Sequence, residues 1–346
     1  MAGKREMLSD LMFKTHATNI LGRFSDSNKL IVFNYHRIRP RHASETLFDD
    51  GVFSADEEQF ARQMKWLKRH ARILSSNDIV EVLETPCHHR GYPLVAVTFD
   101  DGYYDNYTVA YPILKALEIP AFFFICTEMV WDRKLRWWDV AAYLVKRCRK
   151  PSIVVQDRHY DLMDNRVHAT ADLQDRMKHS ELMQIHDIIQ AISEACEIDI
   201  PSDDIQGKEV MTPAQICEMA ENQMIIGSHT HTHRVLTLLN SEQHMEELTL
   251  SKQLLEDATG QAVNTISYPF GRHEFIPASI LDACITCGYD LGFSSNFGIN
   301  YLNRSHPLAL NRFAGDLETV SKVAMISVVP ELFADRKLFS FLEMHR

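Results

Sequence analysis

Short apolar runs alternate with amphipathic segments along most of the chain. Between the runs, helical spacing of apolar residues extends over residues 57–69, 104–117 and 241–259. Strands that alternate with helices predict a mostly parallel sheet, here in one barrel-like α/β domain. Six runs are rich in β-branched and aromatic residues and predict buried strands at residues 30–36, 93–99, 120–126, 224–229, 264–270 and 289–295.

The middle of the chain is less apolar and predicts a helical insertion at about residues 131–215, with a helical segment over 172–196. Thr212 and Pro213 are typical of the N-cap and first turn of the next helix. The insertion could cover a site or build an interface. We expect an N-terminal helical segment (1–29), a main domain (30–315) and a C-terminal helical extension (316–346). The amphipathic stretch 9–24 either packs on the protein or contacts a membrane surface.

Composition excludes several classes of protein. The chain has 346 residues, of which 45% are hydrophobic and 24% charged, which excludes a disordered or collagen-like chain. The net charge is −11, so we expect no nucleic-acid partner. No apolar run reaches the ~18 residues of a membrane span, and no signal-peptide core is found. We therefore expect a cytoplasmic location and no transmembrane segment, while the oligomeric state stays open.

The seven cysteines favour free thiols. Cys284 and Cys287 form a C-x-x-C pair without the second pair that a four-cysteine zinc site needs. We interpret both as buried thiols of a helix that ends near Gly288. Free cysteines agree with a reducing compartment.

Two adjacent carboxylates follow the strand at 93–99. Asp100 and Asp101 precede Gly102, which permits a sharp exit from the strand. Because close carboxylates repel each other, a nearby cation is expected. The alternative is a β-turn in which an aspartate makes local hydrogen bonds.

Three histidines follow the strand at 224–229. If the chain turns helically after His229, then His229 and His233 can reach one metal ion and His231 points elsewhere. Asp101 would complete a set of three ligands, which leaves positions open for water as in catalytic metal sites. The alternative is a polar loop in a chain that has 17 histidines.

Three further features are weaker signals. The turn SYPFG at 267–271 can aim the Phe270 N–H at a developing oxyanion, although a structural turn is the default. His36 ends a buried strand, where a lone histidine is more often a core residue than an acid. Trp137 and Trp138 either pack internally or stack on a sugar ring.

Together these motifs resemble the polysaccharide deacetylase family with the NodB homology domain (carbohydrate esterase family four). TFDDG at 98–102, HTHTH at 229–233 and SYPFG at 267–271 are similar to its three motifs, in the same order. The resemblance spans about residues 30–315. It implies a distorted (β/α) barrel and a metal-dependent hydrolase that removes N-acetyl groups from a saccharide and releases acetate.

The resemblance also implies residue roles. Asp100 would be the general base, Asp101, His229 and His233 would hold one divalent metal, and the Phe270 N–H would line the oxyanion site. Zinc is the expected metal, and imidazole and carboxylate ligands also suit Co, Mn, Ni or Fe.

The sequence departs from the family pattern in two places. Ser267 stands where the family commonly has an arginine that orients the base; Arg312 is the first candidate to replace it and Arg272 the second. The C-terminal Leu-x-His motif that supplies the general acid is missing. Tyr35 and His36 resemble the permuted Tyr-His strand of poly-N-acetylglucosamine deacetylases, which favours His36 as the acid.

Two other functions stay open at this point. The fold could support a metal-dependent amidohydrolase that acts on a non-sugar C–N bond, or a catalytically silent relative that binds metal or sugar. For a deacetylase, the expected substrate is a cytoplasmic nucleotide-linked, lipid-linked or oligosaccharide precursor. Its sugar and chain length stay open.

Overall fold

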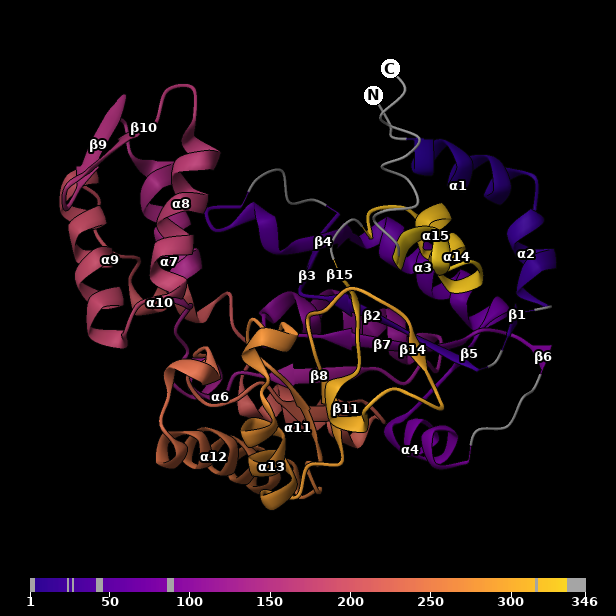
Figure 1. Ribbon diagram of the computed structural model, residues 1–346. Helices are drawn as coiled ribbons and strands as arrows, with labels where there is room; N and C mark the ends of the chain where they lie inside the picture. Colours follow the sequence, from indigo (N-terminus) through magenta and orange to yellow (C-terminus); the bar gives the residue numbers. More distant parts are fainter. Residues whose placement is uncertain are drawn as a thin grey trace.

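A curled, mostly parallel sheet forms the centre of the protein (Figure 1). The computed structural model describes residues 4–23, 25–26, 28–41, 46–85, 90–314 and 317–334. The sheet runs in the order β13-β12-β11-β8-β7-β2-β14, with β15 beside β2 and β5 beside β7, and an isolated parallel bridge between Phe293 of β13 and Leu310 links β13 to the segment that leads into β15. Its strands are β2 (Lys29–Tyr35), β5 (Arg72–Ile73), β7 (Leu94–Phe99), β8 (Phe122–Ile125), β11 (Ile225–Ser228), β12 (Thr265–Ser267), β13 (Leu291–Phe293), β14 (Asn300–Tyr301) and β15 (Phe313–Ala314).

All six predicted strands are confirmed, and the register explains their sequence pattern. β2 and β7 are parallel neighbours from Leu30 opposite Leu94 to Tyr35 opposite Phe99. Every residue of β7 is buried. Strands covered on both faces read as continuous apolar runs rather than as alternating ones. Within this sheet the short β14 differs from the other strands, because it pairs antiparallel with β2.

Helices cover the sheet and begin and end at the residues that capping chemistry favours. Thr212 caps α11 with Pro213 in its first turn, as predicted. Gly260 ends α12 in the left-handed conformation, with φ 66°. The covering helices are α3 (Glu57–His70), α4 (Ser76–Glu84), α5 (Tyr111–Ala116), α6 (Thr127–Trp131), α11 (Pro213–Glu221), α12 (Ser241–Thr259) and α13 (Ala278–Thr286).

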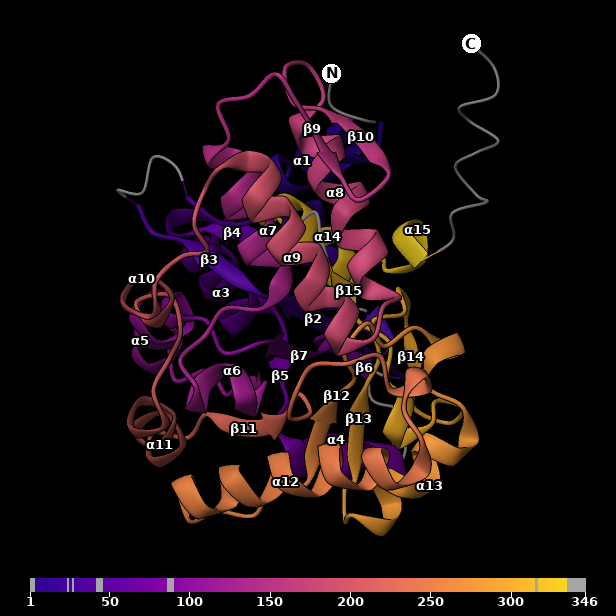
Figure 2. The same ribbon diagram turned by 90° about the vertical axis from the view of Figure 1, so that its left-hand side faces the viewer.

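Residues 137–207 form a largely helical lobe beside the sheet, on the left of Figure 1 and on the side that faces the viewer in Figure 2. The range 172–196 is helical as expected except for an interruption, because the chain turns at 179–181 and Glu181 starts a new helix with a capping box to Gln184. The lobe contains α7 (Trp137–Arg147), β9 (Ser152–Val155), β10 (Arg158–Asp161), α8 (Arg166–Lys178), α9 (Leu182–Cys196) and α10 (Asp203–Gly207).

The N-terminal helices pack on the protein itself, which was one of the two expectations for this segment. α1 (Lys4–Lys14) and α2 (Ala17–Gly22) lie against α14 (Val320–Val328), and the Ser321 hydroxyl donates to Asp10. None of the helices in the described ranges is long and apolar enough to cross a membrane. Of the C-terminal extension, the structure describes α14 and α15 (Glu331–Ala334), and residues 335–346 lie outside the described part.

Smaller elements complete the chain. The expected helix over 104–117 is a π-helical turn, η2 (Asn106–Ala110), that continues into α5 at Tyr111, one residue before Pro112. Cys284 is buried as expected, whereas Cys287 is only partly buried and the prediction is wrong for it. The remaining short elements are β1 (Ser25–Asp26), β3 (Arg37–Arg39), β4 (Phe53–Asp56), β6 (Arg90–Gly91), η1 (Asp50–Val52), η3 (Leu236–Leu238), η4 (His273–Phe275) and η5 (Pro307–Ala309).

Candidate active site

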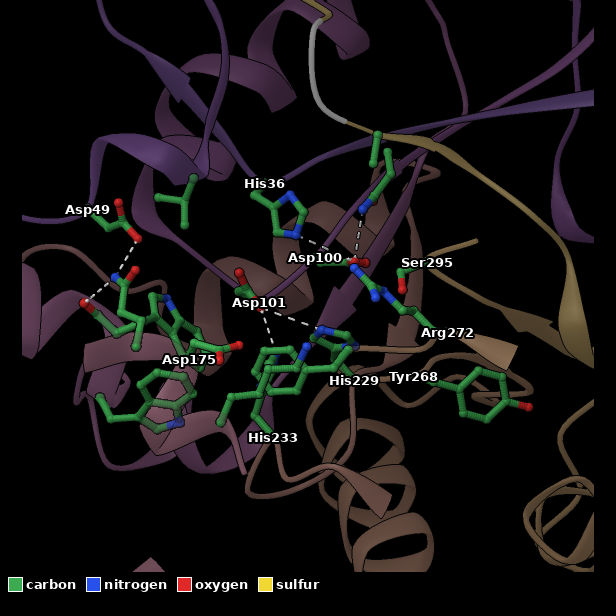
Figure 3. Close-up of a pocket in the computed structure, with 18 of the residues that line it drawn as sticks. His36, Asp49, Asp100, Asp101, Asp175, His229, His233, Tyr268, Arg272 and Ser295 are labelled. Atoms are coloured by element: carbon green, nitrogen blue, oxygen red, sulfur yellow. Dashed lines mark hydrogen bonds and ion pairs between the residues drawn. The ribbon is translucent and has the colours of Figure 1, made fainter. Parts of the chain in front are cut away.

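A cavity of about 450 Å³ opens at the carboxyl ends of the parallel strands (Figure 3). This volume lies in the usual range for small-molecule sites. Loops that follow the strands of a parallel sheet meet at this edge, which explains why residues far apart in sequence converge here. The cavity is lined by all seven residues singled out from the sequence, namely His36, Asp100, Asp101, His229, His233, Phe270 and Arg312.

The two aspartates after β7 serve different sides of the cavity because the chain turns sharply between them. Asp101 has a positive φ of 80° and Gly102 one of 109°. A Cβ on Gly102 would meet a methyl group of Val130 at 3.0 Å. Glycine therefore suits this position because of both the positive φ and the lack of space. Asp100 points toward Arg312, while Asp101 points toward His229 and His233.

Asp101, His229 and His233 form a compact buried group. The Nε2 atoms of His229 and His233 lie 3.5 Å and 3.3 Å from Asp101 Oδ1. One ligand atom from each residue lies within 4.8 Å of the others. The spacing of two imidazoles and one carboxylate suits a single ion with positions left for water.

The hydrogen bonding of His229 shows that a cation fits this group. Its Nδ1 lies 2.7 Å from the Ser267 carbonyl oxygen, which can only accept, so Nδ1 carries the proton. Burial lowers the pKa of His229 to about 4, so the ring is neutral at pH 7. Its Nε2 lone pair therefore faces the carboxylate of Asp101, with Nε2 3.5 Å from Oδ1. Two facing acceptors repel each other unless a cation lies between them.

His229 and His233 lie beside Asp101 although the chain does not turn helically after His229, so the expected helical turn is wrong. Thr230 and His233 have positive φ values of 61° and 60°. The Glu247 carboxylate of α12 supports the turn by accepting from the N–H groups of His231 and Thr232. His231 points away from the cavity, as predicted, with Nδ1 2.9 Å from the Thr127 hydroxyl.

Arg312 holds Asp100 through a bidentate ion pair. Its Nη1 and Nη2 donate to the two carboxylate oxygens at 2.8 Å each, and Asn34 donates to Oδ2 at 3.1 Å. Burial alone would raise the pKa of Asp100, but the Arg312 guanidinium holds that pKa well below its usual range. Arg272, the second candidate, is exposed and lies 4.0 Å from Glu274 instead.

Removal of Arg312 is expected to destabilise the protein strongly. In Arg312→Met the buried Asp100 loses its charge partner, and a broken buried pair typically costs about 3–5 kcal/mol in the free energy of unfolding. Urea unfolding measures this loss. The matched Arg272→Met at an exposed position should stay within about 0.5 kcal/mol of wild type, and equal stability of both variants would contradict the assignment.

His36 lies on the cavity side at the end of β2. Its Nε2 is 3.9 Å from Asp100 Oδ2, and the ring is partly exposed. The Asn106 side chain binds its carbonyl and the Ser54 hydroxyl binds its N–H, which fix the backbone. The preceding Tyr35 points to the opposite face and donates to Gln63, in agreement with strand alternation.

Phe270 occupies the turn after β12 with a positive φ of 52°. Within the described ranges its N–H donates to no protein acceptor. Its ring packs nearly parallel to Trp137 at 6.2 Å and edge-on to His233 at 5.1 Å. Trp138 packs on His233 at 4.6 Å, so the tryptophan pair of α7 does line the cavity.

Sequence reasoning missed several residues of the cavity. Asn34 binds both Asp100 and Arg312, and its signal was a polar side chain inside an otherwise apolar strand. Gln174, Asp175 and Lys178 of α8 also line the cavity. Nothing local to the α8 sequence indicates that this helix folds over the cavity.

Relatives of known name match parts of the chain. YxkH of Bacillus subtilis, whose name assigns it to the polysaccharide deacetylases, is 22% identical over 270 residues, which is 78% of this chain and 66% of that protein. The poly-β-1,6-N-acetyl-D-glucosamine N-deacetylase of Staphylococcus aureus is 30% identical over 123 residues, or 33% of this chain and 42% of that enzyme. The chain thus matches less than two thirds of the length of either relative.

Solved structures share the fold. The deacetylase PplD of Streptococcus pyogenes superposes with a TM-score of 0.55 at 20% identity, over 83% of this chain and 92% of that one. IcaB from Ammonifex degensii gives the same TM-score at 18% identity, over 87% and 97%. The family model for polysaccharide deacetylases matches residues 89–292, more than half of the sequence. The chain therefore belongs to the polysaccharide deacetylase family.

Proposed function

We propose that the protein is a metal-dependent hydrolase that removes N-acetyl groups from an N-acetylhexosamine-containing saccharide and releases acetate. The observation that carries this proposal is the pairing of two arrangements in one cavity. A buried Asp–His–His group suited to a divalent cation opens onto the same space as a carboxylate held by an arginine. Zinc is the metal we favour for two imidazoles and one carboxylate, and Co, Mn, Ni or Fe also suit these ligands.

The proposed reaction begins with attack of water on the amide carbon. A divalent metal held by Asp101, His229 and His233 would polarise the acetyl carbonyl and acidify the attacking water. Asp100 accepts the proton from that water, because its ion pair with Arg312 keeps it ionised and fixes its direction. The Phe270 N–H donates to the oxyanion, and one such donor is typically worth about 2.7–4 kcal/mol.

The second half of the reaction needs an acid for the leaving amine. His36 lies at the rim of the cavity, partly exposed and 3.9 Å from Asp100. In this position a protonated imidazole can deliver its proton to the sugar nitrogen as the C–N bond breaks. The amine leaves neutral together with acetic acid, which loses its remaining proton to solvent and becomes acetate.

His36→Ala is therefore expected to lower kcat by about 10²–10⁴-fold, the usual contribution of a positioned acid. The metal content should stay at the wild-type level, because His36 is outside the Asp–His–His group. Acetate release and metal content per chain are measured for both the variant and wild type. His70→Ala is a matched control on α3, where the ring packs on Trp66. Unchanged kinetics in His36→Ala would leave His36 with a structural role only.

The function itself is tested by acetate release from N-acetylated chito-oligosaccharides and β-1,6-linked N-acetylglucosamine oligomers. We expect release that stops with a chelator and returns on addition of zinc or cobalt. Hydrolysis of a simple acetanilide without release from either oligomer would favour the non-sugar amidohydrolase. No release from any acetyl donor by the metal-loaded protein would overturn the proposal and favour a silent relative.

A further inference from the structure

Helix α8 of the insertion has two distinct faces. Ala169, Leu173 and Met177 are buried in the lobe and recur at helical spacing. Residues 171, 174, 175 and 178 follow the i, i+3, i+4, i+7 pattern, which places them on the opposite side of the helix. This second face lines the cavity that holds the Asp–His–His group, through Ala171, Gln174, Asp175 and Lys178.

Side-chain contacts hold α8 over the cavity. The Gln174 amide donates to Asp49 Oδ2 at 2.8 Å and to the Trp138 carbonyl at 3.1 Å. The Lys178 Nζ lies 5.1 Å from the ring centroid of Phe270 on the other side. Because α8 is tied to the loop after β3 and to the turn after β12, it forms a wall of the cavity rather than a distant lobe.

Two side chains of this wall keep polar atoms available. The nearest basic group to Asp175 is the exposed His179, at 3.9 Å. Among the residues the structure describes, Lys178 has no carboxylate within 4 Å. Asp172, one position outside the cavity face, is paired with Arg158 at 2.9 Å instead. Asp175 is labelled in Figure 3 beside the cavity that Asp101 and His233 share.

The chemistry of this wall matches a sugar ring. Trp137 lines the same cavity and offers an aromatic face against which the apolar side of a sugar can pack. A carboxylate that accepts and an ammonium that donates complement hydroxyl groups, which do both. We propose that α8 is a substrate-binding wall on which Asp175 and Lys178 hydrogen-bond the hydroxyl groups of the sugar unit that packs on Trp137. This inference rests on the proposed function and names specificity-determining residues for it.

The test compares Asp175→Asn and Lys178→Met with wild type on N-acetylated chitotriose. Loss of one hydrogen bond to a charged group is expected to raise KM by about tenfold or more, and to raise KM rather than lower kcat. Binding of the same oligosaccharide is measured independently by calorimetry and by intrinsic tryptophan fluorescence. The metal content of each variant, measured by mass spectrometry, should match wild type.

The matched controls come from the same lobe. Asp172→Asn changes an acid on α8 that faces away from the cavity, and Lys208→Met changes an exposed lysine paired with Asp204. Both should bind chitotriose like wild type. A merely structural role for the wall would weaken all four variants to the same extent, which would overturn the inference.

The outcomes separate this inference from the proposed function. If wild type binds chitotriose but releases acetate from none of the acetyl donors, and the two α8 variants lose affinity, the deacetylase function fails and the inference stands. If wild type releases acetate and both variants keep its KM and affinity, the inference fails and the function stands. If wild type does not bind chitotriose and releases acetate neither from it nor from the β-1,6-linked oligomers, both are overturned.

Discussion

Asp100→Asn is expected to lose about 10²–10⁴-fold in kcat, the contribution of a positioned general base. Asparagine keeps the shape of the side chain, and its oxygen still accepts from Arg312. It cannot take a proton from water at neutral pH. The Asp–His–His group does not include Asp100, so metal content should not change. Single-turnover acetate release and metal analysis on the same preparation measure both quantities.

The fold of this variant has to be measured as well, because Asp100 is buried and paired with Arg312. An asparagine leaves the guanidinium without a full charge partner, which lowers the free energy of unfolding. Asp105→Asn is a useful comparison, since Asp105 is also a buried acid paired with an arginine, Arg37, outside the cavity. It should lose stability with far less effect on kcat. Turnover close to wild type in Asp100→Asn would show that another group is the base.

Metal analysis is expected to show about one divalent ion per wild-type chain and almost none in Asp101→Ala or His229→Ala. Each change removes one of only three protein ligands, and the remaining two hold an ion weakly. The protein is purified without a metal-affinity tag, incubated with zinc or cobalt, and measured by mass spectrometry. Chelation of wild type should abolish acetate release to the same extent as these substitutions.

His231→Ala is the matched control for this measurement. His231 belongs to the same HTHTH segment, but its ring contacts the Thr127 hydroxyl rather than Asp101. Its metal content should equal that of wild type. If wild type takes up no metal, or if His231→Ala loses metal as His229→Ala does, the assigned ligand set is wrong.

The sequence predicts this site well where chemistry follows directly from a strand end. Asp100, Asp101 and His229 each stand at the end of a buried run, so their convergence follows from parallel strand packing. The choice between Arg312 and Arg272 needed the structure, because it depends on β15 pairing with β2. Asn34 was hidden in an apolar run, although its polarity there was a detectable signal.

The placement of α8 could not be predicted from the sequence. The helix docks through Gln174 on Asp49 and Lys178 on Phe270, contacts between residues about a hundred positions apart. Such long-range contacts leave no periodic pattern in either segment. The break between α8 and α9 was missed for a different reason, since Glu181 is an uncommon N-cap residue.

The backbone of the site is also a cost to the folded protein. Non-glycine residues in the left-handed region carry a conformational penalty of roughly 1–2 kcal/mol each, least for aspartate. Four of them stand in the turns that carry the Asp–His–His group and Phe270, namely Asp101, Thr230, His233 and Phe270. In a library selected for stability, substitutions should therefore accumulate at these positions. Glycine there would relieve the backbone strain of the turn, but it would also remove a ligand or reshape the cavity. Selection for thermal stability alone is therefore expected to replace residues of the site first. These positions should be kept fixed when the protein is engineered for higher stability.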